Sequence, residues 1–317
     1  MIKINIAVVG ATGLVGQTFL KALENVSFNS LELFTSKKSK GKEITVQGKV
    51  YKTQELTEGS FHKGIDYAFF FAGGEISEEY VPKAAKLGII AIDNSSFFRM
   101  KEGVPLIVPE VNPHKLKGHG NIIANPNCTT IQAVCALKPL HDKFGLKRVI
   151  VSTYQAVSGA GIGAVKDLDE NTTNVLKYPI KNNLFPEIDV ITENGYTKEE
   201  IKIINETRKI LELKELKITS TCVRVPVENG HSESITIELE KEFTIEEVIK
   251  TLEAAKGVKL KNIPQPLNAA DNDDVFVGRI RKDDSAKNSL NIFTVSNNIR
   301  KGAATNALQI MNLLEGM

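Results

Sequence analysis

The chain has 317 residues, of which 42% are hydrophobic and 25% are charged, and its formal net charge is +2. These values are ordinary for a globular protein, and the small net charge excludes the strongly basic class that binds nucleic acids or anionic membranes. The length has room for two domains of about 150 residues each. No apolar run approaches the about 18 residues that span a bilayer. Together with the small net charge, this leads us to expect neither a membrane nor a nucleic acid as a partner.

The cysteine content bears on the compartment. There are three cysteines, an odd number, scattered along the chain. A disulfide framework needs paired cysteines at close spacing, so these favour a reducing compartment. The first residues lead into a predicted strand and lack the order of a signal peptide. We therefore expect a cytoplasmic protein.

Predicted strands and helices alternate over about the first 125 residues. Continuous apolar runs, typical of parallel strands buried on both faces, occur at residues 4–9, 31–34, 67–71 and 89–92. Helical patterns follow the first of these strands and occupy residues 77–87. This alternation predicts a Rossmann-type, doubly wound parallel sheet of the α/β class.

A glycine-rich turn follows the first predicted strand. Gly10, Gly13 and Gly16 lie between that strand and a helix. Glycine allows a tight turn and close approach to a pyrophosphate, which then lies on the helix N-terminus. We interpret the turn as a dinucleotide-binding loop rather than a structural turn. The residues expected to contact the cofactor here are Gly10, Ala11, Thr12, Gly13, Leu14 and Val15.

The end of the second predicted strand bears on which dinucleotide binds. An NAD site has an acidic residue about 20 residues after the loop. This chain has instead hydroxyls and ammonium groups in residues 35–40 (TSKKSK). Such groups suit a 2′-phosphate, although a solvated basic turn has the same composition. Together with the glycine loop they favour NADP(H), with contacts from Ser36, Lys38 and Ser39.

The pattern changes in the second half of the chain. Strands are predicted at residues 149–156, 217–225 and 234–239, and the last alternates polar and apolar residues, as in an antiparallel sheet with one wet face. We predict a long irregular segment from residue 164 to about residue 196. A helix with one apolar face is predicted at residues 301–314.

Cys128 lies where a short apolar run ends and a helical pattern at residues 129–140 begins. This position predicts a helix N-terminus, where unsatisfied amides and the helix dipole lower the pKa of a thiol. Cys135 and Cys222 lie inside apolar runs and are predicted to be small core residues. For Cys128 itself, local sequence leaves both interpretations open, a nucleophile or a buried thiol.

His231 follows a glycine in the predicted turn between two strands. A lone histidine in a loop is commonly a solvated surface residue. A thiolate enzyme, however, needs a partner that moves protons near neutral pH, and histidine fits that task. Arg224, which precedes His231 in the same segment, could present its guanidinium fork to a carboxylate.

Eight segments form a set in chain order. They are residues 10–16, 94–99, 108–112, 125–130, 154–161, 205–209, 224–234 and 300–304. Glycine loops are common, but NPNC at 125–128 combined with GHSE at 230–233 is far more specific. The set resembles the aspartate-semialdehyde dehydrogenase family, and the resemblance covers the whole chain.

This resemblance implies roles for the residues around the thiol. Cys128 is expected to be the nucleophile, His231 the general acid/base, and Gln155 the residue that orients the substrate. Arg224 is expected to bind the substrate carboxylate and Glu206 its ammonium group.

Phosphate and cofactor contacts are also implied by the resemblance. Arg99, Lys209 and Asn94 are expected to bind the phosphate, and no metal is expected. Further cofactor contacts are expected from Ala72, Gly73, Ser158, Gly159 and Asn298. Lys38 stands where the family often has arginine. The single ammonium group of lysine does not reproduce the planar guanidinium fork of arginine.

The resemblance implies two domains and a homodimer. The first would be an NADP-binding domain of residues 1–127, completed by residues 298–317. The second, residues 128–297, would be an α+β catalytic and dimerisation domain with a mostly antiparallel sheet.

The implied reaction is the reversible, NADPH-dependent conversion of L-aspartyl-4-phosphate to L-aspartate 4-semialdehyde through a cysteine thioester, in lysine, threonine and methionine biosynthesis. One alternative is an N-acetyl-γ-glutamyl-phosphate reductase. The motif expected at the nucleophile of that family is Asn-Pro-Gly-Cys, and this chain has Asn127 at the glycine position. A glyceraldehyde-phosphate dehydrogenase is disfavoured, because it is expected to have an acidic ribose ligand and residues 35–40 of this chain contain no acidic residue. A non-catalytic NADP-binding protein is disfavoured because every catalytic position of the set is filled.

Overall fold

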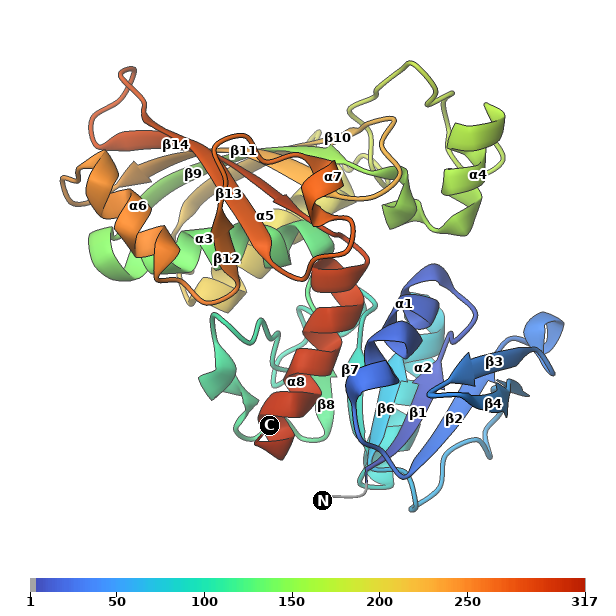
Figure 1. Ribbon diagram of the computed structural model, residues 1–317. Helices are drawn as coiled ribbons and strands as arrows, with labels where there is room; N and C mark the ends of the chain where they lie inside the picture. The colour runs from blue at the N-terminus through green and yellow to red at the C-terminus, as the bar shows by residue number, and fades with distance from the viewer. Residues whose placement is uncertain (1–3, 317) are drawn as a thin grey trace. The chain divides into compact units, whose positions relative to one another are not determined.

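The computed structural model describes residues 4–316 and divides into two compact units (Figure 1). The first unit comprises Met1–Pro126 and Ala303–Met317, and the second comprises Asn127–Gly302. Residues 1–3 and 317, which belong to the predicted first domain, lie outside the described residues.

The first unit contains a six-stranded sheet in the order β5-β2-β1-β6-β7-β8, and every neighbouring pair is parallel. The predicted α/β class and parallel sheet are therefore confirmed. The strands are β1 Asn5–Val9, β2 Ser30–Thr35, β5 Gln54–Glu55, β6 Tyr67–Phe70, β7 Ile90–Asp93 and β8 Ile122–Ala124. A separate hairpin is formed by β3 Glu43–Val46 and β4 Lys49–Lys52.

Helices cover this sheet because their apolar faces need burial. They are α1 Leu14–Ala22, α2 Gly74–Lys86 and α8 Thr305–Glu315, with 3₁₀ turns at Leu23–Asn25, Lys37–Ser39 and Pro113–Leu116. From α8, Ala307, Ile310 and Met311 pack in the same core cluster as Phe19 and Phe69. The predicted apolar face of the C-terminal helix is thus buried in the core of the first unit.

The second unit contains a mixed sheet in the order β10-β9-β11-β14-β13-β12. Its three central pairings are antiparallel and its two outer pairings are parallel, so the predicted mostly antiparallel sheet is confirmed. The strands are β9 Leu146–Gln155, β10 Lys217–Arg224, β11 His231–Leu239, β12 Val258–Leu260, β13 Val275–Lys282 and β14 Ser289–Ser296. The helices are α3 Cys128–Phe144, α4 Ile162–Glu170, α5 Lys198–Leu211, α6 Ile245–Glu253 and α7 Pro266–Ala269, with a 3₁₀ turn at Val157–Ala160 and a π-helical turn at Arg300–Ala304.

The predicted irregular segment at 164–196 is only partly correct, because α4 extends to Glu170. Beyond α4 the chain is irregular but anchored. The Asp167 carboxylate accepts hydrogen bonds from the Thr172 hydroxyl and from the amides of Asn174, Val175 and Leu176. These bonds hold the pKa of Asp167 at about 2, below its usual value, although burial opposes them. The Asp167 carboxylate therefore holds this irregular segment against the end of α4.

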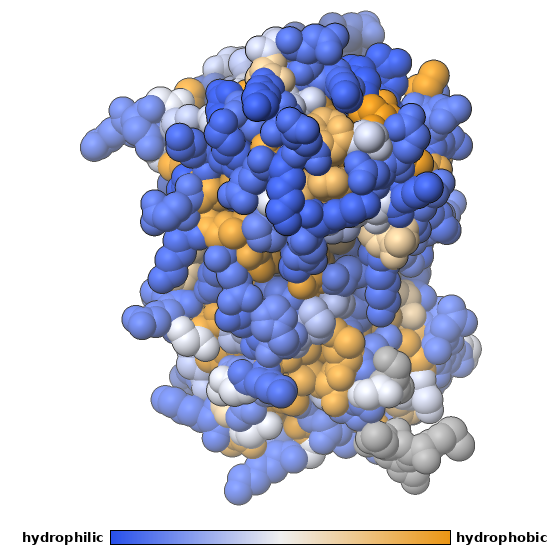
Figure 2. Space-filling model, turned by 90° about the vertical axis from the view of Figure 1, so that its left-hand side faces the viewer, coloured by the Kyte–Doolittle hydropathy of each residue, from blue (hydrophilic) through white to orange (hydrophobic). Residues whose placement is uncertain are grey.

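The surface seen in Figure 2 is mostly hydrophilic, with separate hydrophobic patches between the polar residues. Within the described residues, no helix combines the length and apolar character needed to cross a membrane.

A polar network lies inside the second unit, between α3 and the sheet. Gln132 of α3 donates to the Thr294 hydroxyl at 2.7 Å, and that hydroxyl donates to Glu233 Oε2 at 3.0 Å. Ser296 donates to Gln132 Oε1 at 2.8 Å. Glu233 is fully buried, and burial raises its pKa to about 8 although the bond from Thr294 lowers it. Glu233 is therefore a neutral acid at pH 7, a state that avoids the cost of a buried charge.

We predict that Glu233→Gln changes the pH dependence of stability. Because the pKa of Glu233 is about 8 in the fold and about 4.5 in the unfolded chain, the folded state binds the proton more tightly. Wild-type stability should therefore fall as pH rises from about 4.5 to 8, by on the order of 3 kcal/mol at pH 7. Glutamine cannot ionise, so the Tm of the variant relative to wild type should rise across this range in thermal unfolding.

Glu238→Gln provides the matched control on the same strand. Its pKa is lowered, chiefly by the hydrogen bond from Arg148, so its pH-dependent contribution to stability changes below about pH 4.5 and its replacement should leave the Tm difference from wild type nearly constant from pH 4.5 to 8. A Tm difference between Glu233→Gln and wild type that stays constant from pH 4.5 to 8 would contradict the neutral assignment.

Candidate functional site

The glycine turn of the first unit closes tightly against the neighbouring strand. Gly10 has φ +83°, and a Cβ on this residue would lie 2.4 Å from the Phe71 carbonyl oxygen. A Cβ on Gly16 would lie 2.3 Å from the Gly10 carbonyl oxygen. Both distances are too short for a side chain, so the turn requires glycine at these positions.

The turn leads directly into α1, whose N-cap residue is Gly13. Gly13 has no side chain with which to cap the first amides, and the first turn of α1 has no acidic residue. Leu14 and Val15 begin the helix. An uncapped helix N-terminus beside a tight glycine turn fits the pyrophosphate of a dinucleotide.

Three parallel strands end beside this turn. The Gly10 amide donates to the Phe34 carbonyl of β2 at 2.9 Å, and the hydroxyls of Thr12 and Thr35 are 3.1 Å apart. Ser36, Lys38 and Ser39 follow β2 in a short 3₁₀ turn, with Lys38 exposed. Ala72 and Gly73 follow β6, and Gly73 is the N-cap of α2. The structure therefore gathers these predicted cofactor residues at the carboxyl edge of one sheet.

Arg99 and Asn94, two predicted phosphate ligands, also lie together in the first unit. Arg99 is 7% exposed, and its guanidinium donates to the Asn125 carbonyl at 3.0 Å and the Asn94 carbonyl at 2.9 Å. Asn125 in turn donates to Asn94 Oδ1 at 2.7 Å and accepts from Asn306 at 2.7 Å. Asn125 thus connects the two predicted ligands to α8.

Cys128 is the first residue of α3, as the sequence predicts. Asn127 is the N-cap, and its Oδ1 accepts from the Thr129 amide at 3.0 Å and the Thr130 amide at 3.4 Å. The Asn127 amide donates to Glu206 Oε2 at 2.7 Å. The helix N-terminus that carries the thiol is therefore fixed on both sides of Cys128.

The other two thiols lie in the core. Cys135 and Cys222 are buried, whereas Cys128 is partly exposed. Burial raises the pKa of Cys222 to about 12, so it stays a neutral thiol. The prediction that these two are small core residues is confirmed.

Gly302 lies against the candidate nucleophile, which the sequence did not indicate. A Cβ on Gly302 would lie 2.8 Å from the Cβ of Cys128 and 3.2 Å from its Cα. A side chain at this position would displace Cys128. Only the three-dimensional structure reveals this closeness, because the two positions lie at opposite ends of the second unit in the sequence.

His231 is the first residue of β11 and is fully buried, so the interpretation as a solvated residue in a turn is wrong. Its Nδ1 accepts a hydrogen bond from the Ala156 amide at 3.0 Å. An amide can only donate, so the ring proton lies on Nε2. No described residue hydrogen bonds to this buried Nε2. Burial, and secondly Arg224, lower the pKa of His231 to about 3, so the ring is neutral.

Arg224 and Gly159 lie beside His231. Arg224 is 5% exposed and donates to the Ala156 carbonyl at 2.6 Å. A Cβ on Gly159 would lie 3.3 Å from Arg224 Nη1 and also 3.3 Å from His231 Nε2. Burial lowers the pKa of Arg224, and the negative charges of Glu199 and Cys128 oppose this. The guanidinium therefore lies within electrostatic reach of the Cys128 sulfur.

Further predicted residues lie on two other segments of the second unit. Asn298 donates to Ser158 Oγ at 2.9 Å and accepts from the Gly230 amide at 2.9 Å, so it connects two predicted loops. Glu206 is 1% exposed, and Lys209 lies one helical turn further along α5. Burial lowers the pKa of Lys209, and Glu206 opposes this.

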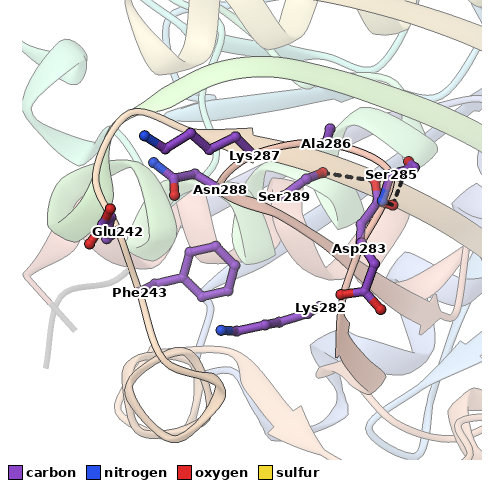
Figure 3. A pocket seen from close by; sticks show the side chains of 10 residues that line it. Glu242, Phe243, Lys282, Asp283, Ser285, Ala286, Lys287, Asn288 and Ser289 are labelled. Atoms are coloured by element: carbon purple, nitrogen blue, oxygen red, sulfur yellow. Dashed lines mark hydrogen bonds between the residues drawn. The ribbon is translucent and has the colours of Figure 1, made fainter.

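Glu199 of α5 belongs to this group and was missed from the sequence. It is 6% exposed and bonds to the side chains of Asn127 and Gln155. A signal was present, because Glu199 precedes Glu206 by seven residues and so lies on the same helix face. By contrast, the surface pocket at the β13–β14 turn, lined by residues 242–243 and 282–289, contains none of the predicted site residues (Figure 3).

Comparison with known proteins gives matches along the whole chain. The family model for the semialdehyde dehydrogenase NAD-binding domain matches residues 5–119, and the model for the semialdehyde dehydrogenase dimerisation domain matches residues 137–301. The chain is 51% identical to an aspartate-semialdehyde dehydrogenase of Aquifex aeolicus, over 98% of this chain and 97% of the relative.

Solved structures give the same result. The aspartate semialdehyde dehydrogenase II of Vibrio cholerae, complexed with ASA, superposes with a TM-score of 0.97 at 40% identity, over 100% of this chain and 99% of the other. The Candida albicans enzyme with NADP gives a TM-score of 0.81 at 26% identity, over 99% of both chains. This chain, with its NAD(P)-binding domain and its dimerisation domain, belongs to the aspartate-semialdehyde dehydrogenase family.

Proposed function

We propose that the protein catalyses the reversible, NADPH-dependent reductive dephosphorylation of L-aspartyl-4-phosphate to L-aspartate 4-semialdehyde. The observation that carries this proposal is the group formed in the second unit by Cys128, Arg224 and a neutral, buried His231. A thiolate, a guanidinium and a proton donor are the groups that acyl transfer from an anionic substrate needs.

Cys128 performs the first step as nucleophile. Its thiolate attacks the acyl carbon of the substrate, a C–S bond forms, the C–O bond to phosphate breaks, and phosphate leaves. The capped N-terminus of α3 favours the negative charge on sulfur before the attack. Arg99, Lys209 and Asn94 bind the departing phosphate and stabilise its charge.

NADPH, when bound, supplies the hydride that reduces the resulting thioester. His231 holds its proton at Nε2, the atom that faces no other partner among the described residues. This N–H donates to the oxygen of the reacting carbon as negative charge develops there. The C–S bond then breaks, which releases the semialdehyde and restores the thiolate.

The remaining roles concern substrate binding. Arg224 binds the substrate carboxylate, Glu206 binds its free ammonium group, and Gln155 orients the reacting carbonyl. A free ammonium distinguishes this substrate from N-acetyl-γ-glutamyl phosphate, whose amine is blocked. The buried carboxylate of Glu206 therefore favours the aspartyl substrate over this alternative.

NADP(H) is the proposed cofactor. The glycine turn and the uncapped N-terminus of α1 fit its pyrophosphate, and the exposed Lys38 fits its 2′-phosphate. The proposed contacts are Gly10, Ala11, Thr12, Gly13, Leu14, Val15, Ser36, Lys38, Ser39, Ala72, Gly73, Ser158, Gly159 and Asn298. The relative from Candida albicans, solved with NADP, supports this choice.

A cytoplasmic homodimer is the proposed state of the protein. The match to a family dimerisation domain supports the dimer. Large hydrophobic side chains of the second unit, including Val175, Leu184, Val190 and Ile191, are more than half exposed, as expected of a surface that a second copy covers. The thiol state of the cysteines is consistent with a reducing compartment.

The direct test is an assay of the purified protein with aspartate semialdehyde, phosphate and NADP. We expect NADPH to form, as followed by absorbance, only when both phosphate and the semialdehyde are present. Turnover with N-acetylglutamate semialdehyde instead would reassign the substrate, and no turnover with either aldehyde would refute the proposal.

We predict that Cys128→Ala abolishes turnover and leaves NADPH binding nearly intact, because the sulfur forms the covalent intermediate and the glycine turn lies in the other unit. Turnover is followed by the NADPH assay, and binding by fluorescence titration. Cys135→Ala is the matched control. The Cys135 thiol is buried in the same helix, so this variant should retain activity. Substantial turnover by Cys128→Ala would exclude the thioester mechanism.

We predict that Lys38→Glu raises the KM for NADP by about 10-fold or more and leaves the KM for NAD nearly unchanged. The carboxylate would repel the 2′-phosphate, and NAD lacks that group. Lys42→Glu, a neighbouring exposed lysine outside the proposed contacts, is the control. Equal increases of the two KM values in Lys38→Glu would show that this residue does not read the 2′-phosphate.

A further inference from the structure

We propose that Glu199 is a positioning residue of this reaction, because its one carboxylate ties the residue before the nucleophile to Gln155 and fixes the orientation of both amides. This inference rests on the proposed roles of Cys128 and Gln155. Glu199 need not touch the substrate, since it acts through these two neighbours.

Asn127 and Gln155 donate to the same oxygen of Glu199. Oε1 accepts from Asn127 Nδ2 at 2.9 Å and from Gln155 Nε2 at 3.1 Å. Oε2 accepts from Lys202 Nζ at 3.1 Å, and Lys202 also donates to Asp189 at 2.8 Å. Helix α5 thus places an anion between the start of α3 and the end of β9.

An ionised carboxylate can only accept hydrogen bonds, so each amide must turn its NH₂ group toward Glu199. The carbonyl oxygen of Asn127 then faces α3, where it caps the amides of Thr129 and Thr130. The carbonyl oxygen of Gln155 faces the Thr153 hydroxyl, which donates to it at 2.9 Å. One negative charge therefore defines two amide orientations beside the reacting groups.

The charge of Glu199 is stable in spite of burial. Burial by itself raises the pKa of this carboxyl, but Lys202 and the bonds from Asn127 and Gln155 outweigh it and hold the pKa at about 2. The orientation of the amides is therefore constant over the pH range in which an enzyme of this kind is assayed.

Glu199→Gln keeps the shape of the side chain and removes its charge. A glutamine offers one accepting and one donating end, whereas the site needs acceptors toward Asn127, Gln155 and Lys202. Whichever way the new amide turns, a donor meets a donor. The new carbonyl oxygen should turn toward the charged Lys202, because a charge-assisted hydrogen bond is the stronger one. The NH₂ group then meets the NH₂ groups of Asn127 and Gln155, so both positioning contacts are lost and unsatisfied polar groups remain in the interior.

The next residue provides a matched control. Glu200 is 7% exposed and lies in the same first turn of α5. Its carboxylate accepts from the Thr197 amide at 2.7 Å and the Cys222 amide at 2.9 Å, and therefore secures α5 and β10. Glu200→Gln should cost stability, but its bonds reach neither Asn127 nor Gln155.

The experiment compares the two variants in the full-length protein with the aspartate semialdehyde, phosphate and NADP assay. We expect Glu199→Gln to lower kcat by about 10- to 100-fold, the effect of losing hydrogen bonds to a charged group, with the KM for NADP nearly unchanged. Glu200→Gln should lower Tm at least as much as Glu199→Gln does, and its kcat should stay within about twofold of the wild-type value. Equal losses of kcat in both variants would overturn the proposal, since both would then reflect stability.

A double-mutant cycle separates positioning from additive damage. We compare the fold-loss of kcat that Glu199→Gln causes in wild type and in a Gln155→Ala background. The loss should be smaller by about 3-fold or more in the Gln155→Ala background, because one of the two side chains that Glu199 positions is absent there. Fully additive effects would overturn the positioning role while the proposed function stands. An inactive wild type would instead overturn the proposed function, and the positioning role with it.

Discussion

The N-terminus of α3 is the structural feature on which the candidate site depends, because its buried amides must all be satisfied close to the thiol of Cys128. The carbonyl oxygen of Asn127 satisfies two of these amides, and Glu206 accepts from the amide of Asn127 itself. Glu199 holds the other end of the Asn127 side chain. Two carboxylates on one face of α5 therefore hold the residue that precedes Cys128, and the packing of α5 on α3 fixes the N-terminus of the helix that carries the thiol.

Burial sorts the titratable groups of the second unit into charged and neutral ones. Glu199 has a lysine and two amides around it and keeps its charge, whereas Glu233 has one hydroxyl and takes up a proton. His231, beside Arg224, is neutral for the same reason. Under similar burial, Glu199 stays an anion, Glu233 is a neutral acid and His231 is a neutral base, and the charges and hydrogen-bond donors around each group decide the outcome.

Much of this arrangement was predictable from the sequence. The parallel sheet, the glycine turn and the helix that begins at Cys128 follow from local patterns, since continuous apolar runs and glycine positions report on backbone geometry directly. The burial of His231 was not predictable, because Asn229 and Gly230 indicate a turn and only the pairing of His231 with Ser296 of β14 makes this residue part of a strand. The spacing of Glu199 and Glu206 places both on one helix face, but only the packing of α5 against α3 shows that Glu199 bonds to Asn127 and Gln155.

The division of the chain has a consequence for how the second unit could be rearranged. The second unit is one continuous segment, and its two ends, at Asn127 and Gly302, are neighbours because a Cβ on Gly302 would nearly touch Cys128. Adjacent termini are the geometric condition for inserting one domain into another without disturbing the host fold. The second unit meets this condition, so a circularly permuted or excised form of it would need only a short linker between its ends, and that linker would pass beside Cys128.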